Sequence, residues 1–271
     1  MLYSYGFNNV CTPADLLNRY PDIQPFCNHR NYEGQVRPLS KDTLSPRDFT
    51  SAAKTDSMIK IDAIMVFNDP RDWALDTQVI LDLLMSHKGY LGSLSSKNGD
   101  TSLPNNGWQQ DGQPPLYFTN PDLFWAAAYH LSRLGQGAFR EAFEGVWAAV
   151  TGGPKAGVTL QKEMLGKPFE QTYDYAENVL LKHTARLRGE GQQTRKSVLR
   201  NVYMIGDNPE SDILGANTYG AVASPRGIQW HSLLVRSGVY SGGTPAHRPE
   251  EILDDVWAAV QYGTQQGMKA G

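Results

Sequence analysis

The sequence predicts an α/β fold with a mainly parallel sheet, and three observations support this prediction. Short apolar runs of strand type alternate along the chain with segments whose apolar residues recur at helical spacing. Three of these runs, residues 64–67, 116–118 and 202–205, lead directly into turns that contain Asn, Asp or Pro. A helical pattern follows each turn, which is the order expected of βα units in a parallel sheet.

Composition narrows the class of protein. The chain has 271 residues, of which 40% are hydrophobic and 20% charged, so we expect a packed globular fold of one large or two modest domains. The net charge of −3 gives no electrostatic signature of a nucleic-acid or anionic-membrane partner. No apolar run reaches the roughly 18 residues of a membrane span. The two cysteines, Cys11 and Cys27, are too few for a disulfide framework and fit no zinc-binding spacing, which favours a reducing compartment.

The predicted elements follow from local signals along the chain. Residues 1–57 are largely irregular, except for one helical turn over 13–17 that Thr12 caps and Pro13 begins. The other elements, in order, are a strand over 64–67, a helix led by Asp76 and ending near Gly89, an exposed insertion over 93–113, a strand over 116–118, a helix from about Pro121, a helix over 137–150, a turn and helix over 161–183, a basic surface loop over 184–200, a strand over 202–206 with a helix after it, a strand over 232–238 and a final helix over 249–260.

The turn Gly-Asp-Asn-Pro-Glu-Ser-Asp at residues 206–212 contains the first candidate functional residues. Asp207 lies one residue past an apolar strand, where a carboxylate can face a hard cation such as Mg²⁺. Asp212, on the first turn of the next helix, is placed to orient the metal-binding residues without contacting the metal itself. Helix capping explains Asn208 and its neighbours Pro209 and Glu210 without any metal, so both interpretations stay open.

Two further turns contain polar residues of interest. Lys167 lies between Gly166 and Pro168, and a lysine there can neutralise phosphate charge, although a solvated surface charge is the simpler explanation. Asn120 and Asp122 follow another strand in the segment Phe-Thr-Asn-Pro-Asp. They cap a helix in the simpler interpretation and contact an anionic or polar substrate in the functional one.

Together these segments resemble a known superfamily. Gly-Lys-Pro at 166–168, followed by an apolar strand and Gly-Asp-x-x-x-x-Asp at 206–212, looks like motifs III and IV of the haloacid dehalogenase (HAD) superfamily. The cap-like stretch with Thr-Asn-Pro-Asp at 119–122 resembles its class IIA, or NagD-like, branch. The segments YGFNNVCTPADLL, IDAIMVFNDPRDWALDTQVILDLL, RLGQGAF and LVRSGVY resemble a eukaryotic sub-branch, the cat eye syndrome critical region protein 5-like or HAD hydrolase domain-containing 5 proteins. The likeness extends over nearly the whole chain.

The resemblance implies a Mg²⁺-dependent phosphatase-like hydrolase of the phosphomonoester class. In such enzymes an Asp nucleophile attacks phosphorus, a lysine holds the phosphoryl group, and the motif IV acid binds Mg²⁺. By their positions in these motifs, Lys167 corresponds to the catalytic lysine, Asp207 to the metal ligand and Asp212 to its second acidic partner. Asn120 and Asp122 match the cap segment and are expected to bind the small phosphorylated substrate.

One part of the family pattern has no match. The nucleophile belongs to an Asp-x-Asp pair directly after the first strand, and residues 1–57 contain neither that pair nor the motif II Ser or Thr after a strand. The nearest imitation is IMVFNDPRD, where Asp69 and Asp72 follow a strand at a spacing of three instead of two. We therefore expect that the chain begins after the family's first strands and is inactive alone.

The resemblance also predicts the domain organisation and the cellular context. It divides the chain into an irregular lead-in (1–57), an inserted α/β class IIA cap domain (58–155) and the C-terminal half of a HAD Rossmannoid core (156–271). A half-core leaves a sheet edge uncovered, so we expect homo-oligomerisation or association through that edge. Relatives in this sub-branch are associated with mitochondria, and fungal ones with glycerophospholipid biosynthesis. The cytoplasm is the alternative, because no targeting pattern is visible at the N-terminus.

Two other functions are alternatives. A non-catalytic binding or scaffold protein derived from the HAD fold would melt cooperatively as a monodisperse species without stabilisation by Mg²⁺. A nucleotide-binding protein is disfavoured, because no strand leads into Gly-x-Gly-x-x-G and the segment GQGAF at 135–139 lacks the third glycine.

Overall fold

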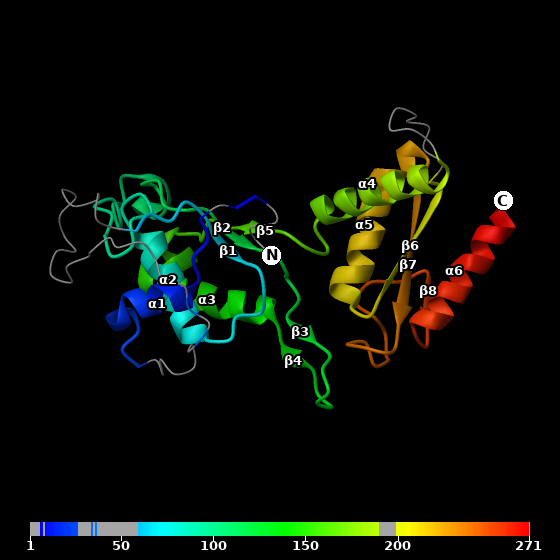
Figure 1. The fold of residues 1–271 in the computed structure, drawn as a ribbon, viewed down its shortest axis with the longest axis horizontal. Helices are drawn as coiled ribbons and strands as arrows, with labels where there is room; N and C mark the ends of the chain where they lie inside the picture. Colours follow the sequence, from blue (N-terminus) through cyan, green and yellow to red (C-terminus); the bar gives the residue numbers. More distant parts are fainter. Residues whose placement is uncertain are drawn as a thin grey trace. The chain divides into compact units, whose positions relative to one another are not determined.

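A computed structural model describes residues 6–7, 9–26, 34, 36, 59–189 and 199–270 (Figure 1). The chain divides into two compact units. Unit 1 comprises residues 1–117 and 141–163, and unit 2 comprises residues 118–140 and 164–271. The division predicted from the sequence, 1–57, 58–155 and 156–271, stays a prediction. Among the helices in the described part of the chain, none is both long and apolar enough to cross a bilayer.

Unit 1 begins with helix α1 (Pro13–Arg19), which confirms the predicted helical turn and extends it by two residues. Thr12 accepts a hydrogen bond from the Asp15 N–H, and the Asp15 carboxylate accepts one from the Thr12 N–H, so the start of the helix has a complete capping box. Leu16 and Leu17 are buried against Leu75 of helix α2 and its neighbours. The cap therefore fixes where α1 begins, and packing on α2 holds it in place.

Three short strands form a sheet in the order β1-β2-β5. Its strands are β1 (Ile64–Val66), β2 (Leu116–Phe118) and β5 (Glu163–Met164), and the first two match the predicted strands. Strand β5 falls where a turn was expected, because a two-residue strand with one polar member has no period to detect. The helices that follow β1 and precede β5 are α2 (Trp73–Met85) and α3 (Gln136–Thr151).

Helix α2 differs from the prediction at both ends. Asp72 is its N-cap and accepts a hydrogen bond from the Leu75 N–H, so the helix begins before Asp76. It ends at Met85, short of Gly89, whose φ of +83° belongs to the turn that follows. Burial raises the pKa of the Asp76 carboxyl to about 6, and the negative charge of Asp72 adds to this effect.

The raised pKa of Asp76 predicts a pH effect on stability. Because the folded state holds this proton more tightly than the unfolded state does, stability should fall as the pH rises from about 4 to 7. Between these pH values the free energy of unfolding of the wild type should fall by about 1 kcal/mol, after allowance for solvent screening. The Asp76→Asn variant should not show this fall, because it lacks the titrating carboxyl. Urea unfolding at several pH values measures it. Asp174→Asn, on helix α4 of unit 2, is the matched control, and equal pH profiles for wild type and Asp76→Asn would contradict the prediction.

The segment 93–113, expected to be an exposed insertion, is packed into unit 1. Ser95, Gly107 and Asp111 are buried, and the Trp108 ring meets the buried Trp147 ring edge-on at 5.9 Å. Gly107 has a φ of +75°, and a side chain there would collide with the Lys97 carbonyl. Polar composition was misleading because these polar groups bond one another instead of water.

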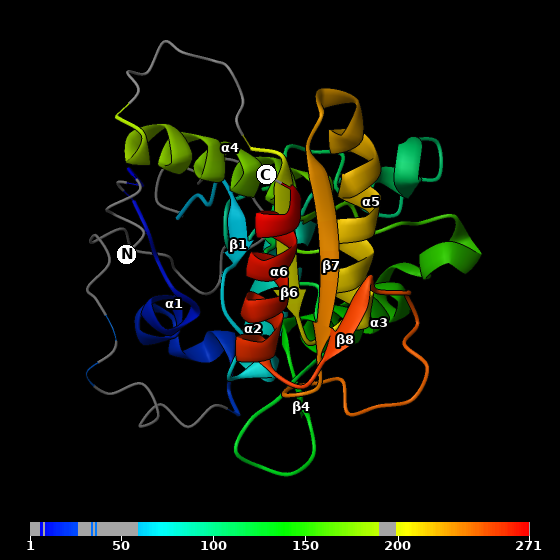
Figure 2. The same ribbon diagram turned by 90° about the vertical axis from the view of Figure 1, so that its right-hand side faces the viewer.

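Unit 2 is built on a parallel sheet in the order β6-β7-β8 (Figures 1 and 2). Helices α4 and α5 cover one face and helix α6 the other (Figure 1). The first face buries Val202, Ala216 and Tyr219, and the second buries Leu233 and Ala259. The strands are β6 (Asn201–Gly206), β7 (Gln229–Val235) and β8 (Glu251–Leu253), and the helices are α4 (Glu170–Leu187), α5 (Leu214–Ala223) and α6 (Val256–Ala270).

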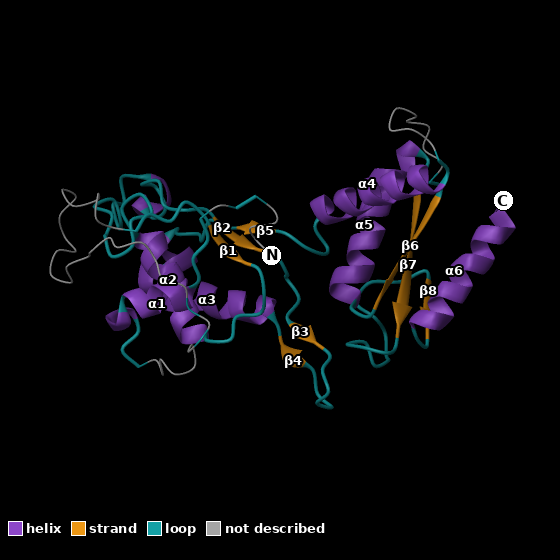
Figure 3. Ribbon diagram, viewed as in Figure 1, coloured by secondary structure: helices purple, strands orange, loops and turns teal. Residues whose placement is uncertain are grey.

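This arrangement confirms the predicted α/β class with a parallel sheet. Strand β6 pairs with β7 along one edge, and no strand in the described part of unit 2 borders its other edge (Figure 3). Exposed backbone donors and acceptors on such an edge are a template for a further strand.

Three predicted elements of unit 2 are wrong. The chain after Pro121 forms an antiparallel pair, β3 (Phe124–Trp125) with β4 (Arg133–Leu134), and the helix begins only at Gln136. Residues 251–253 pair with β7 as β8, so the last helix starts at Val256. Helix α4 runs to Leu187, into the predicted basic loop, and residues 190–198 of that loop lie outside the described residues. In the first two cases strand pairing overrode a local helical pattern.

Candidate active site

Asp207 lies at the carboxyl end of β6, as predicted. Its Oδ2 accepts a hydrogen bond of 2.7 Å from the Val239 N–H, and its carbonyl accepts one of 3.0 Å from the Tyr240 N–H. Gly238 packs so closely on the Asp207 carboxylate that a Cβ at this position would collide with it. The loop after β7 therefore fixes the direction of the Asp207 side chain. No described group bonds its other carboxylate oxygen.

Asp212 is buried on the helical turn Pro209–Ile213, which Asn208 caps through the Glu210 N–H. The Asp212 carboxylate uses both oxygens: Oδ2 accepts from the Asn208 N–H at 3.0 Å, and Oδ1 accepts from the Lys167 ammonium at 2.5 Å. Gly206, at the end of β6, leaves room for this carboxylate because it has no Cβ. The capping interpretation is thus correct for Asn208, and Asp212 has an additional partner that capping does not explain.

Lys167 lies in the loop between β5 and α4. Its Nζ is 2.5 Å from Asp212 Oδ1 and 3.9 Å from Asp122 Oδ2. Burial lowers the pKa of Lys167, but the hydrogen bond to Asp212 and the charges of the surrounding carboxylates outweigh it, so the net pKa is raised. The side chain is therefore a cation at neutral pH, surrounded by carboxylates and still 36% exposed. It is not the isolated solvated charge of the simpler interpretation.

Asn120 and Asp122 form the turn after β2. Asn120 Oδ1 accepts from the Asp122 N–H at 3.0 Å, and both N–H groups of Thr119 and Asn120 donate to the buried Gln136. Asp122 Oδ1 accepts from the Asn208 side-chain amide at 3.2 Å. Burial raises the pKa of the Asp122 carboxyl, and the charges of the two other aspartates act in the same direction. The Asn120 side chain thus orders its own turn, while Asp122 belongs to the charged cluster.

The four charged residues that the sequence singled out converge in unit 2. Lys167 contacts Asp122 and Asp212, and the negative charge of Asp207 reaches it as well. A hollow of about 450 Å³ opens beside Asp122, Asp207 and Asn208, and Phe124 and Trp125 form part of its wall. Its position beyond the carboxyl end of β6 is where α/β folds bind their ligands.

Sequence reasoning missed several residues that support this cluster. Tyr173 of α4 donates to the carbonyls of Ser211 and Asp212, and burial raises its pKa, so it stays protonated and holds this turn. Gly238 and Val239 hold Asp207, and they belong to the segment LVRSGVY, which carried the family resemblance but received no role. Phe124 and Trp125 were assigned to a helix. Only the tertiary structure brings these residues to the cluster.

The cluster is suited to a magnesium ion only in part. Mg²⁺ is commonly bound by one or two carboxylates, with water and substrate oxygens completing its shell. Asp207 supplies a fixed carboxylate with one free oxygen, whereas Asp212 is already engaged by Lys167. Over the described ranges, no three His, Cys, Asp or Glu side chains are grouped to hold a metal by themselves. The residues present therefore fit an open site with few protein ligands, not a closed one.

The fold and the site define a class: α/β proteins with a cluster of charged residues beyond the end of a parallel strand, where such folds commonly bind ligands. A family model described as HAD-hydrolase-like matches residues 164–259, a range that includes Lys167, Asp207 and Asp212. A mitochondrial hydrolase of Saccharomyces cerevisiae is 37% identical over 94% of this chain and 66% of its own length. The cardiolipin synthase and mitochondrial hydrolase fusion protein of Schizosaccharomyces pombe is 32% identical over 98% of this chain and 37% of its own length.

The chain belongs to the HAD superfamily of hydrolases, as its motifs predicted. It spans less than two thirds of the length of these two relatives. Among solved structures, a possible sugar phosphatase of the superfamily from Cytophaga hutchinsonii aligns over 89% of this chain and 58% of its own, with 14% identity and a TM-score of 0.39. That likeness is too low to support any argument. The class IIA assignment stays a prediction.

Proposed function

We propose that this chain supplies the metal-binding and phosphate-binding residues of a Mg²⁺-dependent phosphomonoester hydrolase. The supporting observation is the contact of the Lys167 ammonium with the buried Asp212 carboxylate, beside Asp207 at the end of β6. An isolated lysine in a loop does not require a buried carboxylate to hold it. A lysine that must meet a phosphoryl group at a fixed position does.

Each residue has a role in this proposal. Asp207 presents its free carboxylate oxygen to Mg²⁺, which when bound draws electron density from the phosphoryl oxygens. Lys167 neutralises the charge that develops on those oxygens. Asp212 keeps the Lys167 ammonium in place, and Asp122 extends the acidic wall towards the substrate. The substrate is a small phosphorylated molecule.

Transfer of the phosphoryl group also needs a nucleophile, and the sequence offers no matching residue. No two aspartates in the 271 residues are separated by a single residue. Asp69, the nearest imitation, is exposed in a loop of unit 1, and Asp72 caps α2. The expected activity of this chain alone is therefore little or none, and the proposed reaction belongs to the protein when a nucleophile is supplied.

The test begins with Mg²⁺ binding by the chain itself. We expect MgCl₂ to raise the melting temperature of the wild type, because an ion that binds only the folded state stabilises it. Asp207→Asn should abolish that shift while changing the melting temperature in the absence of Mg²⁺ only slightly, since the amide oxygen still accepts from Val239. Differential scanning calorimetry measures both. Glu163→Gln, a carboxylate of β5 outside the cluster, is the matched control, and an equal Mg²⁺ shift in wild type and Asp207→Asn would refute the assigned ligand.

A second candidate, a non-catalytic binding protein, is favoured by the absence of the Asp-x-Asp pair. An aryl phosphate assay separates the two functions when this chain is compared with a form that carries an upstream extension ending in Asp-x-Asp. Turnover that requires the extension, Lys167 and Asp207 supports the hydrolase. Failure of the extended form to turn over any phosphate ester supports the binding protein.

The cellular context is likewise a proposal. Both relatives are named as mitochondrial hydrolases, and one is fused to cardiolipin synthase. We infer a mitochondrial location and a link to glycerophospholipid metabolism for this protein. Fractionation of cells that express the tagged full-length protein tests the location.

A further inference from the structure

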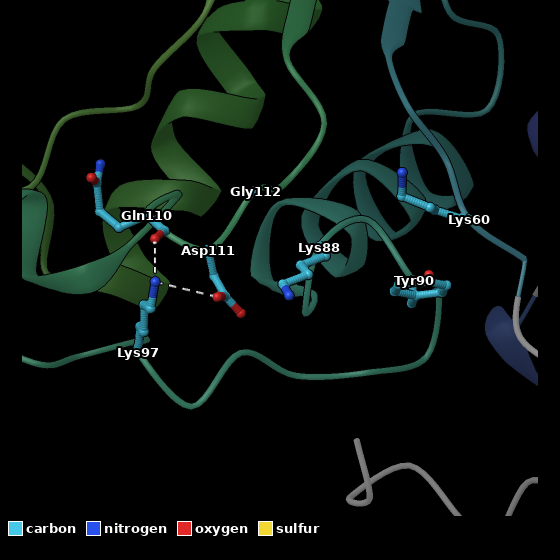
Figure 4. Close-up of a pocket in the computed structure, with 7 residues that line it drawn as sticks. All are labelled: Lys60, Lys88, Tyr90, Lys97, Gln110, Asp111 and Gly112. Carbon is cyan, nitrogen blue, oxygen red and sulfur yellow. Dashed lines mark hydrogen bonds and ion pairs between the residues drawn. The ribbon is translucent and has the colours of Figure 1, made fainter. Parts of the chain in front are cut away.

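A second polar hollow, of about 500 Å³, lies on unit 1 (Figure 4). Its wall is formed by Lys60, Lys88, Tyr90, Lys97, Asp111 and Gly112, which come from separate turns of the chain. In Figure 4, Lys97 and Asp111 lie on one side, Lys60 on the other and Lys88 between them. Three lysines thus line one hollow, and the residues that surround it have no role in the proposed hydrolase site.

The three lysines differ in how their charges are compensated. Lys60 Nζ is 2.6 Å from Asp62 Oδ1, an exposed pair two residues apart. Lys97 Nζ donates to the Gln110 carbonyl at 2.9 Å and lies 3.4 Å from Asp111 Oδ1. Within the part of the chain that the structure describes, no ion pair or hydrogen bond of the Lys88 ammonium is found. Its charge is therefore available to a ligand.

Asp111, the one carboxylate in the wall, is already occupied. Its Oδ2 accepts from Ser95 Oγ at 2.9 Å and meets His87 Nδ1 at 2.7 Å, and its side chain is 8% exposed. Burial raises the pKa of Asp111, but its hydrogen bonds to His87 and Ser95 lower it further, so the group is an anion at neutral pH. Asp111 thus anchors Lys97 at the wall and leaves Lys88 uncompensated.

The backbone at Lys88 gives an independent reason to assign a function. Its φ is +53°, a left-handed conformation that costs a residue other than glycine about 1 kcal/mol. Gly89 follows with φ +83° and leaves no room for a Cβ beside the Ile61 carbonyl, so the turn is enforced. Glycine would suit position 88 better, yet a lysine stands there. Gly112 lines the same wall, and a Cβ added there would lie 3.6 Å from the Lys88 Cγ.

We infer that this hollow binds the phosphate group of a soluble small molecule. Ammonium groups act as point charges towards phosphate. Lys88 supplies an uncompensated charge, and the exposed pair of Lys60 with Asp62 is of the weak surface kind that a phosphate oxygen can replace. A membrane surface is the less suitable partner, because the wall contains no aliphatic side chain apart from the lysine stems. The site is independent of the proposed hydrolase function.

Inorganic pyrophosphate is the probe, titrated into the whole chain by calorimetry. The Lys88→Gly variant should bind at least about tenfold more weakly, as expected for the loss of one charge-assisted hydrogen bond. Its fold is preserved, because glycine adopts φ +53° without strain. Lys97→Gln should weaken binding as well, and Lys155→Ala, an exposed lysine of unit 1 outside the hollow, should not. Binding should weaken with added NaCl because the lysines are exposed.

The Lys167→Ala variant separates this site from the one in unit 2. Pyrophosphate binding that survives in Lys167→Ala and is lost in Lys88→Gly supports the inference. Binding that is lost only in Lys167→Ala, or that is equal in wild type and Lys88→Gly, overturns it. Binding of phosphatidic acid vesicles through Lys88 without any binding of pyrophosphate overturns the soluble ligand in favour of a lipid surface.

Discussion

Replacing Lys167 with alanine is expected to lower the free energy of unfolding by about 2 kcal/mol or more. Its ammonium lies 2.5 Å from Asp212, whose side chain is only 2% exposed. Removing one partner leaves a buried charge without compensation, which costs about 3–5 kcal/mol in fully buried pairs. We place the effect below that range because Lys167 itself is 36% exposed and water can partly replace it. Urea unfolding at pH 7 measures the loss.

The pair of variants Lys167→Ala and Asp212→Asn distinguishes this cause from lost packing. Asn can still accept the hydrogen bond from the Asn208 N–H, but it carries no charge that would be left unpaired. Lys167→Ala in the Asp212→Asn background should therefore cost much less than in the wild type, as a double-mutant cycle reveals. Lys155→Ala, an exposed lysine of unit 1, is the control for loss of a surface charge. If Lys167→Ala lowered the free energy of unfolding equally in both backgrounds, an unpaired buried charge would not be the cause.

Gly206→Ala is expected to destabilise the protein by about 1–3 kcal/mol, the usual cost of overpacking a closed site. A Cβ at Gly206 would overlap the Cβ and carboxylate of Asp212. The alanine methyl must displace the Asp212 side chain, so we expect the variant to weaken the hydrogen bond between Asp212 and the Lys167 ammonium. Thermal unfolding gives the stability change. A pH titration of Lys167 by NMR should show its pKa falling towards the ordinary value, because the hydrogen bond to Asp212 is what raises it.

Gly220→Ala provides the matched comparison for Gly206→Ala. Gly220 lies inside α5, and an added Cβ would meet the Trp230 Cβ at 3.5 Å, an ordinary contact. Alanine in a helix interior is favoured over glycine by about 0.5–1 kcal/mol, so this variant should be more stable than the wild type. Opposite signs for the two glycines are the expected result. Destabilisation of similar size at both would show that the tight contact at Gly206 is not the cause.

The site was predictable in part, because its members follow strands and turns that local patterns reveal. Asp207 follows an apolar run that becomes β6, and Asn208 and Pro209 begin the turn after it as capping preferences require. The parallel class directs attention to polar residues just after strands. Asp122 and Lys167 follow strands of the β1-β2-β5 sheet and Asp207 follows β6 of another sheet, so their proximity was decided by the tertiary structure. Their chemical roles stay predictions.

Other members of the site could not be predicted from the sequence. The segment 121–135 contains polar and apolar residues at spacings that suit a helix, but the turn closed by Asn120 and pinned by Gln136 directs it into the β3–β4 pair. That pairing exposes Phe124 and Trp125 at the hollow beside Asp207. No helical or strand period in the segment itself contains this information, since Gln136 acts from 16 residues away.

The sequence by itself determined the α/β class, the helix starts at Thr12 and Asn208, the HAD motifs and the identity of the charged residues. These features depend on neighbours within a few positions, whose capping and turn geometry is the same in any fold. Only the tertiary structure decided that Lys167 bonds Asp212, 45 residues away, that Gly238 and Val239 fix Asp207, and that residues 251–253 form a strand. The reason is physical: a buried charge and an edge strand are stable only where a distant segment supplies the partner that water would otherwise provide.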